Sequence, residues 1–134
     1  MSELSARRPL VAIIEDDAAV LHSLQFALEA QGYEVCLFER AQDAIDSREI
    51  QDAGCLLIDY GLPDLDGLSM LEALRRRGLD CPAIIIAGHL NARCRKEAGR
   101  AGAVLVEKPI MGDLLNELLR DAMAGKGRLR RTDA

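Results

Sequence analysis

Apolar residues recur along this chain as short runs, and most runs are followed by a stretch in which apolar residues return at helical spacing. Apolar runs of four or five residues are typical of strands that are buried on both faces of a sheet. They predict strands at residues 10–14, 55–58, 83–87 and 103–106, and a mixed run predicts a further strand at 33–38.

Helices are expected between these strands. The first follows Asp17, which can cap its N-terminus, and ends at Gly32. The other four are expected at 39–48, from 68 to 78, from 91 to about 101, and across 114–119. This alternation predicts a doubly wound α/β fold, in which helices cover both faces of a parallel five-stranded sheet. By analogy with flavodoxin-like folds of this class, we expect the strand order 2-1-3-4-5.

Charged side chains stand within two residues of the ends of three predicted strands. Glu15 and Asp16 follow the first strand, Asp59 follows the third and Lys108 follows the fifth. In open parallel sheets, ligands bind outside the carboxyl ends of the strands, where the strand order reverses. In the expected order these four side chains share one crevice with Ala87, at the end of the fourth strand.

That combination of charges points to a cation and a phosphoryl group. Two carboxylates 4 Å apart repel by about 4 kcal/mol at an intermediate dielectric, so a cluster of them favours a bound cation. Oxygen ligands of this kind suit Mg²⁺. A carboxylate can also attack phosphorus, and neutralising the charge on the transferred group lowers the barrier. We therefore predict that Asp59 accepts a phosphoryl group and that Lys108 neutralises its charge.

Composition narrows the class of protein. A chain of 134 residues with 49% apolar and 29% charged residues suits one globular domain. The net charge of -5 argues against nucleic-acid binding, and no apolar run approaches the roughly 20 residues that span a bilayer. The four cysteines are scattered, which argues against zinc. We expect a cytoplasmic protein with a flexible leader at 1–8, a domain at 9–124 and a basic, disordered tail at 125–134.

Four segments at or after the strand ends carry a common pattern: Ile13 to Asp17, Leu57 to Gly67, Ile85 to Gly88, and Glu107 to Pro109. Taken together and in order, they resemble the receiver domain of two-component response regulators, and the resemblance covers nearly all of residues 9–124. The resemblance implies that a sensor histidine kinase or a phosphotransfer protein phosphorylates Asp59. It also implies a Mg²⁺ site made by Glu15, Asp16, Asp59 and the carbonyl of Gly61.

The resemblance assigns further roles around the phosphoryl group. Lys108 would contact it, and the peptide bond before Pro109 would be cis, as is common in this family. The backbone N–H groups of Tyr60 and Gly88 would donate hydrogen bonds to its oxygens. His89 is open to two interpretations, a residue that tunes the lifetime of the phosphoryl group or a solvated loop histidine.

Two positions depart from the family pattern. The fourth strand of a receiver usually ends in serine or threonine, and here it ends in Ala87. The fifth usually carries an aromatic residue that moves inward on phosphorylation, and here the matching residue is Leu105. We hypothesise that Asp59 still accepts phosphate, whereas the fourth-strand loop moves less than usual or by another route.

Three functions follow from these observations. The first is a receiver that phosphorylates itself from a kinase phosphohistidine and later loses the phosphate to water. It would signal to a downstream protein partner or to a second copy, through its fourth and fifth helices. The second is a degenerate receiver that binds its partner without regard to phosphate. The third, a phosphatase with an aspartate nucleophile, usually needs an acid two residues later, where this chain has Gly61.

Overall fold

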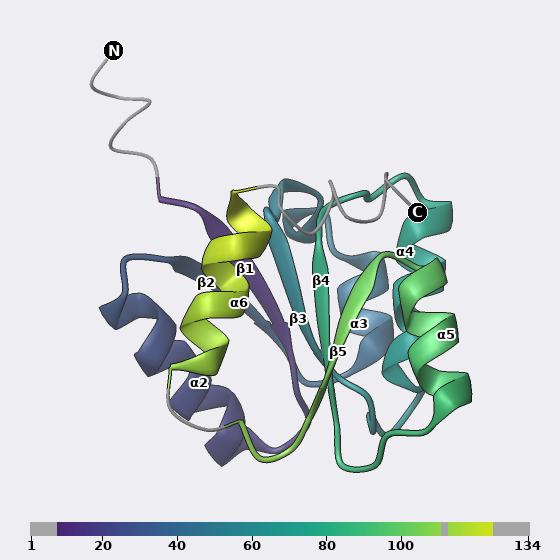
Figure 1. Ribbon diagram of the computed structural model, residues 1–134. Helices are drawn as coiled ribbons and strands as arrows, with labels where there is room; N and C mark the ends of the chain where they lie inside the picture. Colours follow the sequence, from purple (N-terminus) through teal and green to yellow (C-terminus); the bar gives the residue numbers. More distant parts are fainter. Residues whose placement is uncertain (1–7, 111–112, 125–134) are drawn as a thin grey trace.

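The structure, a computed structural model, describes residues 8–110 and 113–124. Five parallel strands form one sheet in the order β2-β1-β3-β4-β5, which confirms the predicted order (Figure 1). The expected tail and all but one residue of the expected leader lie outside the described residues. The strands are β1 (Leu10–Ile14), β2 (Glu34–Phe38), β3 (Cys55–Asp59), β4 (Ala83–Ala87) and β5 (Ala103–Glu107).

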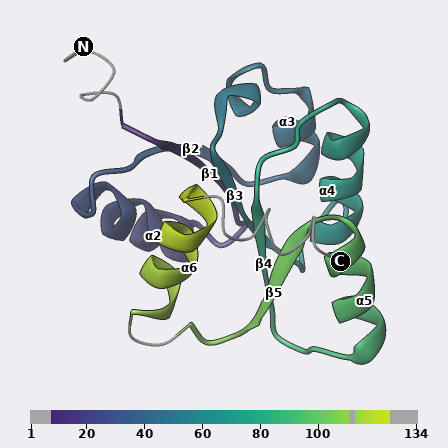
Figure 2. The same ribbon diagram turned by 45° about the horizontal axis from the view of Figure 1, so that its top comes forward.

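Helices cover both faces of this sheet. Two of them, α2 and α6, lie on one face, and α3, α4 and α5 lie on the other (Figures 1 and 2). No helix in the described part of the chain is long and apolar enough to cross a membrane. The helical segments are α2 (Ala18–Ala30), α3 (Ala41–Asp46), the 3-10 turn η1 (Glu49–Asp52), α4 (Gly67–Arg76), α5 (Ala92–Arg100) and α6 (Leu114–Met123).

The central strands β1, β3 and β4 are apolar except for Asp59 at the end of β3, because both faces of the sheet are covered. Val11 and Ile13 of β1 pack in the core under α2 and α6, whereas Ala12 and Ile14 pack in the core under α3 and α4. Alternate side chains of a strand point to opposite faces, so an uninterrupted apolar run supplies both cores.

Side-chain caps fix the starts of three helices. Asp17 accepts hydrogen bonds from the N–H groups of Ala19 and Val20, which confirms its predicted role at the start of α2. Asp66 caps α4 and Asn91 caps α5 in the same manner. Each cap satisfies N–H groups that have no partner within the helix and so defines where the helix begins.

The second predicted helix is the least accurate of the sequence predictions. The pattern predicts a helix at 39–48, whereas α3 covers only Ala41–Asp46. The chain is extended at Ser47 and then forms η1, which the sequence did not predict. Ile50 explains this turn, because its side chain is fully buried and its N–H donates a hydrogen bond to Oγ of Ser47.

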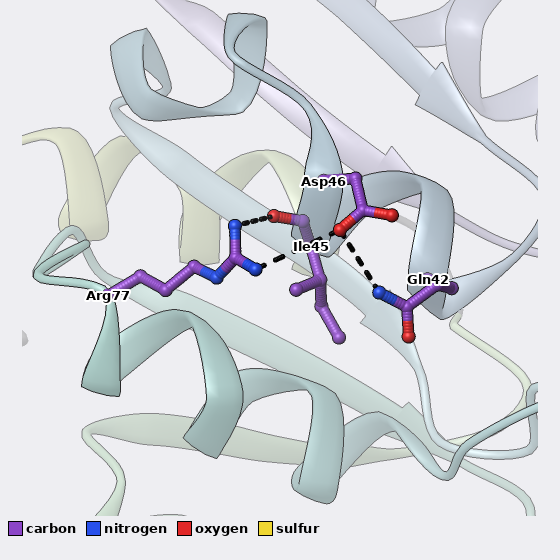
Figure 3. Close-up of polar contacts among 4 residues, drawn as sticks. All are labelled: Gln42, Ile45, Asp46 and Arg77. Carbon is purple, nitrogen blue, oxygen red and sulfur yellow. Dashed lines mark hydrogen bonds and ion pairs between the residues drawn. The ribbon is translucent and has the colours of Figure 1, made fainter.

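The C-terminal end of α3 contacts Arg77, the residue directly after α4. Nη1 of Arg77 donates a hydrogen bond to the carbonyl of Ile45 at 3.0 Å, and Nη2 lies 3.8 Å from Oδ1 of Asp46 (Figure 3). Gln42 donates to the same carboxylate oxygen from within α3. A helix of six residues has little stability of its own, so contacts at its ends contribute to its position.

Candidate functional site

The carboxyl ends of β1, β3 and β5 bring four charged side chains together. Carboxylate oxygens of Glu15, Asp16 and Asp59 lie within 4.8 Å of one another. Nζ of Lys108 lies 2.8 Å from Oδ1 of Asp59. The structure thus unites the acid residues and the lysine that the sequence places after separate strands.

Asp59 owes its position to the sheet. It is the last residue of β3 and pairs with Ile86 of β4, and its side chain is only 6% exposed. The next peptide continues the ladder, because the N–H of Tyr60 donates to the carbonyl of Ile86 at 2.8 Å. A carboxylate at the end of a central strand is therefore held by backbone hydrogen bonds on a rigid element.

Glu15 is also buried, and its environment disfavours its charge. Burial raises the pKa of the Glu15 carboxyl, a hydrogen bond from the N–H of Asp17 opposes this rise, and the nearby charge of Asp59 adds to it. The N–H of Glu15 donates to the carbonyl of Phe38, which fixes the backbone beside β2. A cation bound at this cluster would offset the repulsion between the carboxylates.

Lys108 is held at the end of β5 by its backbone. Its N–H donates to the carbonyl of Ala87 at 2.8 Å, and the peptide bond to Pro109 is cis, as the family resemblance implied. The contact with the Asp59 carboxylate raises the pKa of Lys108, and this outweighs the partial burial that lowers it. The side chain is 44% exposed and carries its positive charge at neutral pH.

The donor set at this cluster fits a divalent cation such as Mg²⁺. Oδ1 of Asp59 is a buried oxygen without a hydrogen-bond donor among the described residues. It forms an ion pair with Nζ of Lys108 at 2.8 Å. Hard divalent cations prefer carboxylate oxygens, and the three acid residues supply them on one side of the crevice.

One predicted phosphoryl contact already has a partner in the sheet. The N–H of Tyr60 donates to the carbonyl of Ile86 at 2.8 Å, and its donation to a phosphoryl oxygen stays a prediction. Gly88 and His89 are both exposed just beyond β4, where the sequence placed them. The predicted ligand Gly61 is exposed in the loop after β3.

The two departures from the receiver pattern occupy the expected places. Ala87 ends β4 and is buried, and Leu105 lies in the middle of β5, partly buried against the core under α3 and α4. Ala87 has no hydroxyl, and its carbonyl accepts the hydrogen bond from Lys108. A methyl side chain at this position can offer a phosphoryl group no hydrogen bond.

Sequence reasoning missed the close contact between Gly67 and the end of β3. A Cβ atom at Gly67, the first residue of α4, would lie 2.7 Å from the carbonyl oxygen of Asp59 and 2.8 Å from Cγ2 of Ile58. The start of α4 therefore packs directly on the backbone of Asp59. In the sequence, a glycine before a helical pattern predicts only a turn. No sequence pattern predicts that Gly67 packs against the end of β3.

Gly67→Ala is expected to lower the free energy of unfolding by about 1–3 kcal/mol, because the methyl group meets backbone that cannot move aside. Urea denaturation would measure this change. Gly99→Ala provides a matched control, because Gly99 lies within α5 and a Cβ there would contact nothing within 4 Å. That control should be neutral or stabilising, and equal losses in both variants would contradict the steric explanation.

Asp64 is a second residue that sequence reasoning missed. It lies in the loop between β3 and α4, and its two oxygens accept hydrogen bonds from the N–H groups of Ala41 and Gln42, each at 3.0 Å. These hydrogen bonds cap the N-terminus of α3 from another segment of the chain. Arg40, the residue directly before α3, makes no side-chain cap. The bond from Gln42 is the main cause that lowers the pKa of Asp64.

This cap predicts an acid-sensitive contribution to stability. The pKa of Asp64 is lower in the folded protein than its ordinary value of 3.8. The carboxylate therefore contributes to the free energy of unfolding above pH 3.8, and this contribution is lost as the pH falls through the lowered pKa of the folded protein. We expect Asp64→Asn to cost about 0.5–1 kcal/mol at neutral pH. Urea denaturation at pH 7 and near pH 3 should show the difference between wild type and variant shrinking at low pH. An unchanged difference would contradict this role.

The fold and the site define a class of protein, the flavodoxin-like α/β domains with an acidic crevice and a lysine at the carboxyl ends of their strands. A family model for the response regulator receiver domain matches residues 11–120. This chain belongs to the response regulator receiver domain family.

Individual relatives agree with this assignment. The chain is 34% identical over 114 residues to the transcriptional regulatory protein FixJ of Bradyrhizobium diazoefficiens, covering 84% of this chain and 56% of the relative. It is 30% identical over 114 residues to the tetrathionate response regulatory protein TtrR of Salmonella typhimurium, covering 84% of this chain and 55% of the relative. This chain thus spans about half the length of these curated relatives.

Solved structures share the fold. A CheY-like response regulator receiver domain protein from Methanospirillum hungatei superposes with a TM-score of 0.80 at 25% identity, covering 91% of this chain and 98% of that one. The receiver domain of a putative Luxo repressor protein from Vibrio parahaemolyticus gives a TM-score of 0.81 at 23% identity, covering 92% and 95%. The second similarity concerns the fold alone.

Proposed function

We propose that this chain accepts a phosphoryl group on Asp59 from a sensor histidine kinase or a phosphotransfer protein. The observation that carries the proposal is the Lys108 ammonium, 2.8 Å from a carboxylate oxygen at the end of the central strand. That carboxylate also belongs to a group of three acid residues. Family membership supports the same reaction, since phosphorylation of an aspartate is the general function of receivers.

In the proposed reaction an oxygen of Asp59 forms a bond to phosphorus, and the bond between phosphorus and the donor's imidazole nitrogen breaks. The imidazole leaves with the electron pair of that bond, and Asp59 becomes an acyl phosphate. Lys108 pairs with the negative charge on the transferred group. Later attack by water would return the free carboxylate, so the chain is a phosphoacceptor rather than an enzyme with turnover.

We assign the Mg²⁺ site of this proposal to Glu15, Asp16, Asp59 and the carbonyl of Gly61, with Glu15 acting through water. When bound, Mg²⁺ would neutralise part of the charge on the phosphoryl oxygens. The three side chains lie together as this role requires, and the exposed Gly61 lies two residues beyond Asp59. The exposed backbone at Gly88 is the proposed N–H donor on the other side of the crevice.

We further propose that the phosphorylated domain signals in the cytoplasm through protein contacts. The candidate surface for a downstream partner, or for a second copy of the chain, is formed by α5 and α6, the fourth and fifth helices of the sequence prediction. The domain itself is not proposed to bind nucleic acid, because the whole chain carries a net charge of -5.

A second function, that of a degenerate receiver that binds its partner without phosphate, is favoured by one specific observation. Ala87 and Leu105 lack the hydroxyl and the aromatic ring through which receivers usually respond to phosphate. Amide NMR spectra of the protein with and without Mg²⁺ and beryllofluoride would separate the two functions. Shifts that extend from the site into β4 and β5 would show a response, whereas shifts confined to Asp59 and its neighbours would favour the degenerate receiver.

Incubation with acetyl phosphate tests phosphorylation itself. Intact-protein mass spectrometry should show a gain of one phosphoryl group when the incubation contains Mg²⁺. It should show no gain when EDTA is present from the start of the incubation. Borohydride reduction followed by peptide mapping should place the modification at Asp59. A protein that stays unmodified with Mg²⁺, or that is modified elsewhere, would contradict the proposed function.

A further inference from the structure

The loop between β3 and α4 is anchored firmly at its base. The N–H of Tyr60 donates to the carbonyl of Ile86, and the N–H of Gly67 donates to the carbonyl of Tyr60, both at 2.8 Å. Leu62 is buried in the core under α3 and α4. These contacts fix both ends of the loop next to Asp59.

The far end of the loop has a separate anchor. Asp64 bonds through both carboxylate oxygens to the first two N–H groups of α3, which are 23 and 22 residues away in the sequence. The capping interaction satisfies N–H groups of α3 that have no partner within the helix. The same interaction therefore holds the tip of the loop against a neighbouring helix.

Gly61 lies between these anchors and has no side chain with which to hold itself. A Cβ atom at this position would contact nothing within 4 Å. The orientation of its carbonyl therefore depends on the anchors at Tyr60, Leu62 and Asp64. Ordering the carbonyl on cation binding costs conformational entropy unless the loop is already fixed.

We propose that Asp64 is a positioning residue for the cation site, because it holds the loop that carries the Gly61 carbonyl in the geometry that Mg²⁺ requires. The inference rests on the proposed function, in which that carbonyl is a Mg²⁺ ligand. Asp64 does not touch the cation in this account. It acts through the loop, by its two hydrogen bonds to α3.

Arg77 provides a matched control at the other end of the same helix. Its guanidinium holds the carbonyl of Ile45 and lies near the carboxylate of Asp46 (Figure 3). Arg77→Gln should loosen α3 from α4 without touching the loop between β3 and α4. A purely structural role of Asp64 would be shared by Arg77, whereas a positioning role would not.

The test is a Mg²⁺ titration of the full chain, followed by amide NMR shifts and paired with the Mg²⁺ dependence of phosphorylation by acetyl phosphate. Asp64→Ala should raise the Mg²⁺ concentration for half-saturation about fivefold. A lost helix cap typically costs about 1 kcal/mol, which corresponds to about that factor in a dissociation constant. The phosphorylation rate at saturating Mg²⁺ should change little. Asp64→Asn keeps one acceptor oxygen and should give a smaller rise, and Arg77→Gln should match wild type.

Each possible result either supports or contradicts the positioning role of Asp64. Wild-type affinity in Asp64→Ala, or an equal loss of affinity in Arg77→Gln, would overturn the positioning role. If the Ala variant does not fold, the Asn variant still decides, because wild-type affinity in a folded Asn variant with a weakened cap would also overturn it. Wild-type protein that binds Mg²⁺ but accepts no phosphoryl group would overturn the proposed function alone. Wild-type protein that binds no Mg²⁺ would overturn both.

Discussion

Asp59→Asn is expected to abolish phosphorylation by acetyl phosphate, so that the intact mass stays unchanged under conditions that modify the wild type. An amide is a far weaker nucleophile than a carboxylate and cannot form the acyl phosphate. The substitution also removes one of three carboxylates that lie within 4.8 Å of one another, so Mg²⁺ should bind more weakly. Mass spectrometry and a Mg²⁺ titration by amide NMR would measure the two effects.

The control for this variant should remove an aspartate without touching the site. Asp52 is exposed in η1, which lies before β3, whereas Asp59 ends that strand. Asp52→Asn makes the same change of charge and is expected to be phosphorylated at the wild-type rate. Phosphorylation of Asp59→Asn at the wild-type rate would show that another residue is the acceptor.

Lys108→Met is expected to slow phosphorylation by about 100-fold at saturating Mg²⁺, the scale of losing one group that stabilises charge in a transition state. Methionine keeps much of the length of the side chain but removes the ammonium that lies 2.8 Å from Oδ1 of Asp59. The rate would be measured by intact mass at several acetyl phosphate concentrations.

Two further variants separate the charge of Lys108 from its shape. Lys108→Arg keeps the positive charge but replaces a compact ammonium with a planar guanidinium, so its rate should lie between those of wild type and Lys108→Met. Lys96→Met removes an exposed lysine of α5 and should behave as wild type. A wild-type rate in Lys108→Met would show that the ion pair with Asp59 has no role in phosphoryl transfer.

The candidate site was largely predictable from the sequence because its residues stand directly after apolar runs. Asp59 follows a short apolar run that predicts a buried strand, and Lys108 lies one residue beyond another such run. In a parallel sheet all strands end at the same side, so residues in these positions converge. The convergence needed only the strand order, which came by analogy rather than from the residues themselves.

The contacts around the site were not predictable in this way. The bonds from Asp64 to α3, and the packing of Gly67 on the backbone of Asp59, join segments whose distance and orientation no local pattern contains. The hydrogen bond from the N–H of Tyr60 to the carbonyl of Ile86 is a further contact of this kind, because it depends on the register between β3 and β4. Register is set by packing of whole strands, not by one residue.

By itself, the sequence determined which segments are strands and helices, where most helices begin, and which charged residues end the strands. These features are local, since they depend on the spacing of apolar residues and on the capping preferences of single side chains. The tertiary structure alone decided that oxygens of three carboxylates lie within 4.8 Å of one another, with an ammonium 2.8 Å from one of them. It also decided that Asp64 and Arg77 form hydrogen bonds at the two ends of α3. These features depend on distances between segments, which are fixed only when the sheet and its two helical layers pack together.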